Sequence, residues 1–102
     1  MAKLISFYWR DIPSHVVGKA GRSKAKKELE PRFAKAIDRA AMRAGRGSSD
    51  AYLADWRRET EMVSGDLETL VAERVAELES QFDDQYLESV VKASGLTGKE
   101  SQ

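Results

Sequence analysis

Cysteine is absent from the 102-residue chain, and histidine occurs once, at position 15. Without cysteine the chain forms no disulfide, no thiolate metal site and no thiol nucleophile. We do not expect a catalytic set of Ser14, His15 and Asp11, because neighbouring residues of a strand usually point to opposite faces. The pair Asp83 and Asp84 lacks the loop glycine and the further ligands of a calcium site. We therefore expect a protein that is not an enzyme and that carries no cofactor or metal.

Long apolar runs are also missing. The chain is 41% hydrophobic and 33% charged, which fits neither a membrane span nor a disordered chain. Residues 1–6 lack the apolar core of a signal peptide, so we expect a cytoplasmic protein that does not enter a membrane. The length suits one domain, which we place at residues 1–95, followed by a flexible tail at 96–102.

An excess of one charge is missing as well, since 17 basic side chains balance 17 acidic ones. The two signs are nevertheless separated along the chain. Residues 19–46 hold ten Lys or Arg and three acids, whereas residues 50–90 hold twelve acids and three arginines. The acidic half can neutralise the basic half within one molecule, or head to tail between two molecules.

The N-terminal segment has the pattern of a β-hairpin. Residues 3–9 are rich in β-branched and aromatic types and too few for a stable helix, so they predict a strand. A turn is expected over residues 11–14 around Pro13, and a second strand over 15–20. Alternation along the first strand places Leu4, Ser6 and Tyr8 on one face, and Ile5, Phe7 and Trp9 on the other.

Three later segments have helical patterns. Pro31 suits a first helical turn, and apolar residues from Phe33 to Ala44 recur at helical spacing before the glycines at 45 and 47. A second helix is expected to open at 64–66 and to carry an apolar stripe from Leu67 to Phe82. The aspartates at 83 and 84 are expected to break it, and a shorter helix to follow, ending near position 95.

Residues 50–62 fit a helix and a strand about equally. We favour a third strand over 51–58, because two strands alone form a marginal sheet. The resulting fold class is α+β: an antiparallel β-hairpin or three-stranded sheet with two to three helices packed on one face. The opposite face is then expected to expose part of the FYWRDIP segment, residues 7–13.

Aromatic residues are scarce, at 8%, yet several stand beside arginines. Tryptophan, tyrosine and arginine dominate the energetically important positions of protein interfaces. They also pack and stack inside protein cores, which is the alternative. We expect a protein partner, or a second copy in a homodimer. The candidate partner-binding residues are Tyr8, Trp9, Arg10, Tyr52, Trp56 and Arg57.

The basic segment 19–46 supports an alternative function, binding of a nucleic acid. The Gly18-x-x-Gly21 pattern matches the phosphate-clamping loop of KH domains, but strand-like residues precede it where a KH domain has a helix. An isoelectric point of 6.6 is low for a dedicated nucleic-acid binder. The candidate anion-binding residues are Lys19, Arg22, Lys24, Lys26 and Lys27.

Three motifs, "YWRDIP" at 8–13, "RFAKAIDRAAMRAG" at 32–45 and "YLADWRR" at 52–58, resemble a family of small bacterial proteins. The family is common in alphaproteobacteria, and its domain is labelled a virulence factor. The resemblance covers roughly residues 3–84 and implies no catalytic residue or cofactor. It also implies a link to folate and corrinoid methyl transfer, and hence an accessory subunit of a one-carbon enzyme. We therefore expect a small interaction or accessory protein.

Overall fold

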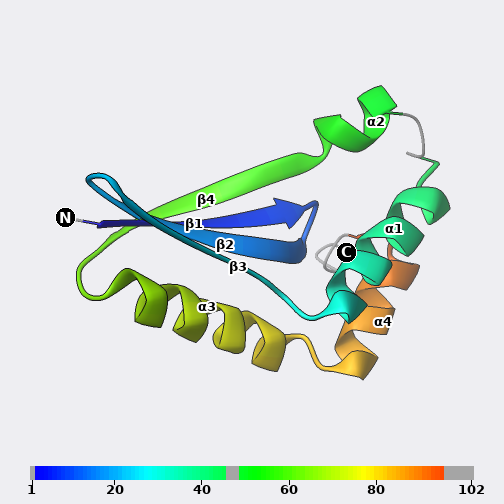
Figure 1. Ribbon diagram of the computed structural model, residues 1–102. Helices are drawn as coiled ribbons and strands as arrows, with labels where there is room; N and C mark the ends of the chain where they lie inside the picture. Colours follow the sequence, from blue (N-terminus) through cyan, green and yellow to red (C-terminus); the bar gives the residue numbers. More distant parts are fainter. Residues whose placement is uncertain (1, 46–48, 96–102) are drawn as a thin grey trace.

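The computed structural model describes residues 2–45 and 49–95 (Figure 1). Its elements in chain order are β1 (Ala2–Trp9), β2 (Ile12–Ala20), β3 (Ser23–Glu28), α1 (Pro31–Arg43), α2 (Ser49–Ala54), β4 (Trp56–Val63), α3 (Leu67–Gln81) and α4 (Asp84–Lys92). The strands form one antiparallel sheet in the order β3-β2-β1-β4. The expected α+β class is confirmed, with four strands in place of two or three. The expected tail, 96–102, lies outside the described residues.

The first hairpin turns earlier than expected. Its turn lies at Arg10 and Asp11, and Arg10 takes a left-handed backbone conformation with φ 54°. Pro13 is part of β2, opposite Tyr8, beside a shift in register between β1 and β2. A proline inside a sheet loses one ladder hydrogen bond, and an irregularity in the pairing is where that loss is tolerated.

One segment differs from the sequence-based expectation, and another forms a strand for which the sequence gives no signal. The strand expected over 51–58 is wrong: residues 49–54 form α2, and the strand β4 follows at 56–63. The indole Nε1 of Trp9 donates a hydrogen bond to the carbonyl of Tyr52 at 2.9 Å, which ties α2 to β1. The lysine-rich residues 23–28, which show no period, form β3 because they pair along β2. Tertiary pairing overrides weak local propensity in both segments.

The expected helices are confirmed. Pro31 lies in the first turn of α1. Asp66 and Asp83 cap α3 and α4, because their carboxylates accept hydrogen bonds from the backbone amides of Thr69 and Tyr86. Asp83 therefore starts α4 directly after α3 ends.

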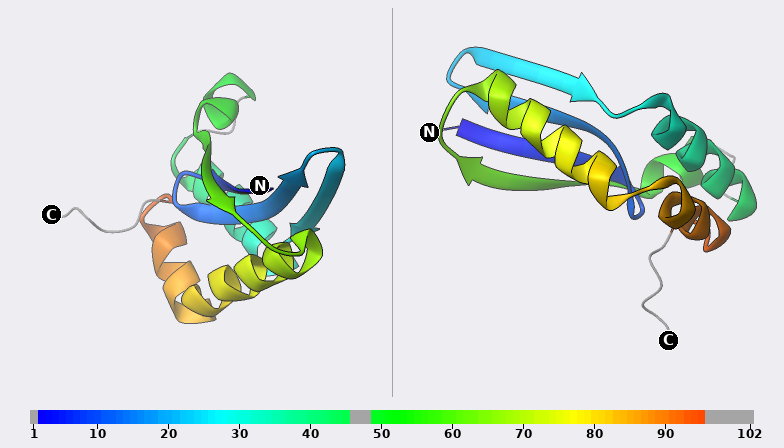
Figure 2. Two further views of the ribbon diagram at one scale, coloured as in Figure 1. Left: turned by 90° about the vertical axis from the view of Figure 1, so that its left-hand side faces the viewer. Right: turned by 90° about the horizontal axis from the view of Figure 1, so that it is seen from below.

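The core lies between the sheet and the helices. Helix α3 runs across one face of the sheet, and α1 packs against α4 at one end of it (Figure 2). Gly18 lies under α3, where an added Cβ would stand 3.0 Å from a methyl group of Val71, so the small residue permits this close approach. The largest fully buried side chains include Trp9, Phe33 and Ile12.

Candidate functional site

One face of the sheet has no helix running along it in the described parts of the chain (Figure 2). Gly18 contacts α3, and the hydroxyl of Ser6 is bonded by Arg74 of α3. Because side chains alternate along a strand, the residues on either side of these two point away from α3. We call this surface the open face, and it consists of Lys3, Ile5, Phe7, His15, Val17, Lys19, Lys24, Lys26, Glu28, Arg58, Thr60 and Met62.

The register of the strands arranges the open face in rows that run across the sheet. The first row joins Lys3, Lys19 and Lys24 on β1, β2 and β3. The second row joins Ile5, Val17 and Lys26, with Thr60 on β4. The third row joins Phe7, His15 and Glu28, with Arg58 on β4. Basic groups therefore surround a short apolar and aromatic centre.

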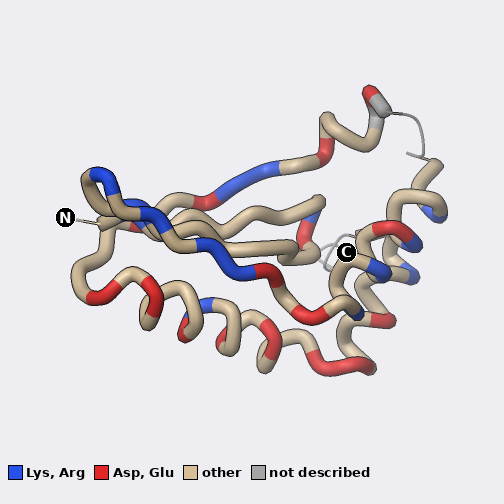
Figure 3. Tube along the Cα trace, in the orientation of Figure 1, with Lys and Arg blue, Asp and Glu red and all other residues tan. Residues whose placement is uncertain are grey.

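Lys3, Lys19 and Lys24 carry unneutralised charge. All three side chains are exposed, and within residues 2–45 and 49–95 none of them forms an ion pair or a side-chain hydrogen bond. The acidic residues of α3 lie on the other side of the sheet (Figure 3). Like charges directly opposite each other on neighbouring strands destabilise a sheet. This lysine row is therefore costly in the free protein and suited to an anion.

The aromatic centre of the open face is a stacked pair. The rings of Phe7 and His15 lie 4.4 Å apart between centroids, with an interplanar angle of 12°, and both residues are half-buried. Burial, and then the charge of Lys26, lower the pKa of His15 below its usual value of 6.5, which keeps the imidazole neutral at pH 7. Ile5 and Val17 form an apolar floor beside the pair and do not belong to the main core.

Trp9, a candidate partner-binding residue, is fully buried, which favours the alternative of core packing for this side chain. Tyr52 of α2 stacks on its indole ring, with 5.9 Å between centroids, and Gly95 lies against its far edge. Trp56 packs edge to face on Tyr52 at 5.8 Å, and both are half-buried. These aromatics close the end of the core at the β1–β2 turn.

Tyr8, Arg10 and Arg57 also make internal contacts. Arg57 lies over the ring of Tyr8, 4.5 Å from its centroid, and its guanidinium donates hydrogen bonds to Asp11 and Glu59. Arg10 donates to a carboxylate of Asp55 at 3.2 Å and to the carbonyl of Ser94 at 2.9 Å. Burial and the neighbouring Glu59 raise the pKa of Tyr8. The structure thus gathers the six candidates at one end of the sheet, in contacts with one another.

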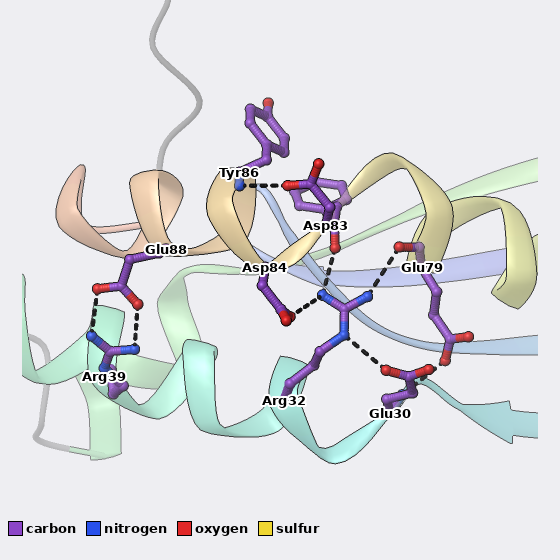
Figure 4. Close-up of polar contacts among 9 residues, drawn as sticks. Glu30, Arg32, Arg39, Glu79, Asp83, Asp84, Tyr86 and Glu88 are labelled. Carbon is purple, nitrogen blue, oxygen red and sulfur yellow. Dashed lines mark hydrogen bonds and ion pairs between the residues drawn. The ribbon is translucent and has the colours of Figure 1, made fainter.

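The basic segment 19–46 divides into two parts with different surroundings. On α1, Arg32 contacts Glu30 and Asp84, and Arg39 forms a bidentate pair with Glu88 at 2.8 Å (Figure 4). For these two arginines the acids that neutralise the charge belong to the same molecule. On the sheet, Lys19, Lys24 and Lys26 of the five anion-binding candidates lie on the open face. Lys27 points to the α3 side and Arg22 lies in the β2–β3 turn.

The candidates named from the sequence did not include Lys3, Phe7, His15 or Arg58 of the open face. Alternation along 3–9 already placed Lys3 on the same side as Phe7. The neighbours of these two residues on β2 and β4 depend on the register, which a single sequence does not reveal. Nothing in the sequence distinguishes Phe7 from its neighbours Tyr8 and Trp9, because all three residues are aromatic.

Other kinds of site are not seen in the described parts of the chain. No group of three His, Asp or Glu residues is placed to hold a metal ion there. Among the same residues, no helix has the length and apolar character that crossing a bilayer requires.

Comparison with known proteins agrees with the resemblance carried by the three motifs. No match was found among curated proteins or among solved structures. The model of one protein family matches residues 7–91, a range that runs from the end of β1 almost to the end of α4. That family is described as "virulence factor", and the chain belongs to it.

Proposed function

We propose that this chain is a nucleic-acid-binding protein that holds phosphate groups with the lysines of its open face. The observation that carries the proposal is the row formed by Lys3, Lys19 and Lys24 across three adjacent strands. Lysine is a mobile point charge that binds phosphates without a fixed geometry. A polyanion laid along this row removes the repulsion between the three ammonium groups.

The balanced net charge does not oppose this proposal, because several of the acids pair with arginines away from the lysine row. Exposed acids of α3 such as Glu73 and Glu77 lie on the helix side of the sheet (Figure 3). Glu68 lies nearer the β3 edge, where it lines pockets together with Lys24. Exposed charges are screened over about 8 Å at physiological ionic strength. A nucleic acid on the open face therefore encounters the lysine row at close range. Glu28 lies on the same face, where Lys26 pairs with it at 3.9 Å.

The test measures binding of a labelled 12-nucleotide single strand by fluorescence anisotropy. It compares the wild type with the double variant Lys19→Glu, Lys24→Glu. Binding by the wild type is expected to weaken with salt, with a log–log slope near −0.7 for each phosphate contacted, or roughly −2 for three contacts. The charge-reversed variant is expected to bind at least roughly tenfold more weakly. A matched control, Lys35→Glu with Lys92→Glu, makes the same charge change on exposed residues of α1 and α4.

Equal weakening by both double variants would show that only net charge matters, and would reject the open face as the site. Binding that does not respond to salt would reject phosphate recognition altogether. Circular dichroism of each variant confirms that the comparison is made between folded proteins.

The accessory role beside a folate or corrinoid methyl-transfer enzyme, which the family resemblance implies, stays a prediction, as does a homodimer. Co-purification of such an enzyme with the native protein tests the accessory role. The variant with Lys19→Glu and Lys24→Glu separates the two functions, because an enzyme partner retained by this variant uses another surface.

A further inference from the structure

The stacked pair Phe7–His15 lies on the same face as the lysine row, two side-chain rows away along β1 and β2. Resting on the function proposed above, we infer that the open face takes single-stranded nucleic acid. One base extends the stack formed by Phe7 and His15, and the lysine row holds the neighbouring phosphates. The inference adds a requirement for unpaired bases to the phosphate contacts.

The geometry of the pair suits a base. Two rings that are nearly parallel at 4.4 Å already form a short stack, and each has an outer side on which a further flat ring can continue it. Arg58 follows Phe7 in the same row, on β4, and is exposed. Within the described residues its guanidinium forms no ion pair, so it is free to cover a base by a cation–π contact.

The spacing also suits a nucleotide chain. Phe7 and Lys3 are four residues apart on one strand, which corresponds to about 13 Å at the usual strand rise. Four-stranded sheets with half-exposed aromatic rings stack two or three bases in this way. The buried side chains of Ile5 and Val17 lie between the two rows, so the surface there is formed by the rows themselves.

Other anionic partners fit less of the open face. Duplex DNA or RNA offers phosphates to the lysines, but its bases are already stacked inside the helix and leave the aromatic pair unused. An acidic protein segment offers carboxylates and no flat rings. A single strand is the partner whose charges and rings match both the lysine row and the Phe7–His15 pair.

The experiment compares two probes of equal length and charge, a 12-nucleotide single strand and the same phosphodiester chain without bases. Wild-type protein is expected to bind the intact strand at least about tenfold more tightly, since one stacked base accounts for a factor of this size. Phe7→Leu keeps an apolar strand residue and removes the ring. It is expected to abolish the preference while leaving the affinity for the abasic chain unchanged.

Two further variants keep the test decisive. Phe7→Tyr retains an aromatic ring and is expected to retain the preference for the intact strand. Arg58→Gln alters an exposed residue without touching the packing of Phe7, and is expected to reduce the preference about threefold by removing the cation–π contact. The result with Arg58→Gln applies even if Phe7→Leu does not fold.

The outcomes separate this inference from the proposed function. If wild-type protein binds both probes equally, or if Phe7→Leu keeps the preference, base stacking is overturned while phosphate binding stands. If neither probe binds, both proposals are overturned. A 12-base-pair duplex or polyglutamate that competes as strongly as the single strand, at equal total charge, also overturns the inference of single-strand recognition.

Discussion

The basic segment of the chain has two parts, and the structure treats them in opposite ways. At the helical end, Arg32 and Arg39 of α1 lie against acids of α4 and of the loop before α1 (Figure 4). On the sheet, Lys19 and Lys24 lie beside another lysine and have no acidic partner among the described residues. The same run of positive charge is therefore structural in one place and available for binding in the other.

The type of basic residue follows this division. Arg32 donates to the carbonyls of Phe82 and Glu79, at 2.5 and 3.0 Å, and so satisfies backbone groups at the C-terminal end of α3. The fixed fork of guanidinium donors suits such multiple contacts, whereas an ammonium group does not hold a geometry. Arginine on α1 and lysine on the sheet thus have the chemistry that each place requires. Substitutions in the two regions should have different consequences.

Trp9→Ala is expected to have the largest effect, and on stability only. The side chain is fully buried between α2 and the end of α4. Truncating a buried tryptophan costs about 3–5 kcal/mol of the free energy of unfolding. Urea denaturation measures this loss. If Trp9→Ala leaves stability unchanged and abolishes partner binding, Trp9 belongs to an interface and the assignment to the core is wrong.

Arg32→Ala is expected to have the second largest effect on stability. It removes charge-assisted hydrogen bonds to two helix-end carbonyls and is expected to cost about 2 kcal/mol of stability. Arg32→Lys restores the charge but not both bonds, and should recover only a minor part. Both variants are expected to bind the 12-nucleotide strand with wild-type affinity at a temperature where they are folded. A loss of affinity would place α1 in the binding surface and remove the contrast between the two regions.

Lys19→Thr is expected to raise the stability of the protein, whereas Trp9→Ala and Arg32→Ala lower it. The ammonium group of Lys19 lies between those of Lys3 and Lys24, so its removal relieves repulsion on both sides. At low salt the free energy of unfolding should rise by roughly 0.5 kcal/mol, while affinity for the strand falls. Thermal unfolding in low and high salt measures the gain, which screening should diminish. Lys35→Thr on α1 is the matched control and should give no gain.

The smallest expected effect is the contribution of His15 to the pH dependence of stability. Burial and then Lys26 lower its pKa in the folded protein, with Glu28 acting in the opposite direction. The unfolded chain therefore takes up this proton first as the pH falls through 6.5. Stability should decline from that point down to the lower pKa of the folded state, and not change further below it on account of His15. Urea unfolding curves across this pH range should show the free energy of unfolding of the wild type falling as the pH falls. His15→Gln should lack this part of the decline.

Helices α1, α3 and α4 and the first strand follow from the sequence because their signals are local. The apolar spacing of α1 and α3, Pro31 in a first turn and Asp66 as a cap are all visible without tertiary information. Strand β3 is different: it has no apolar alternation, and it exists because Gly21, with φ 58°, turns the chain back along β2. The open face depends on that pairing, so only part of it could be predicted.

Residues 49–63 show why the other residues of the site could not be predicted from the sequence. Tyr52 and Trp56 fit a helical stripe and a strand face equally well. The choice is made by Trp9, whose indole bonds the carbonyl of Tyr52. The polar composition of β4 suits its place at an edge, where Glu61 is paired by Arg74 of α3. These contacts join residues more than ten positions apart, and a local pattern does not contain them.

Strand β3 forms the other edge of the sheet, so backbone groups on its outer side face no neighbouring strand in the described residues. Such edges recruit strands from other molecules. A second copy that added its own β3 would bring Lys24, Lys26 and Lys27 of both chains together, and the repulsion opposes this pairing. Lys24, which we propose for ligand binding, thus also helps to keep the sheet from growing between molecules. A ligand that neutralises them leaves this edge open to self-association.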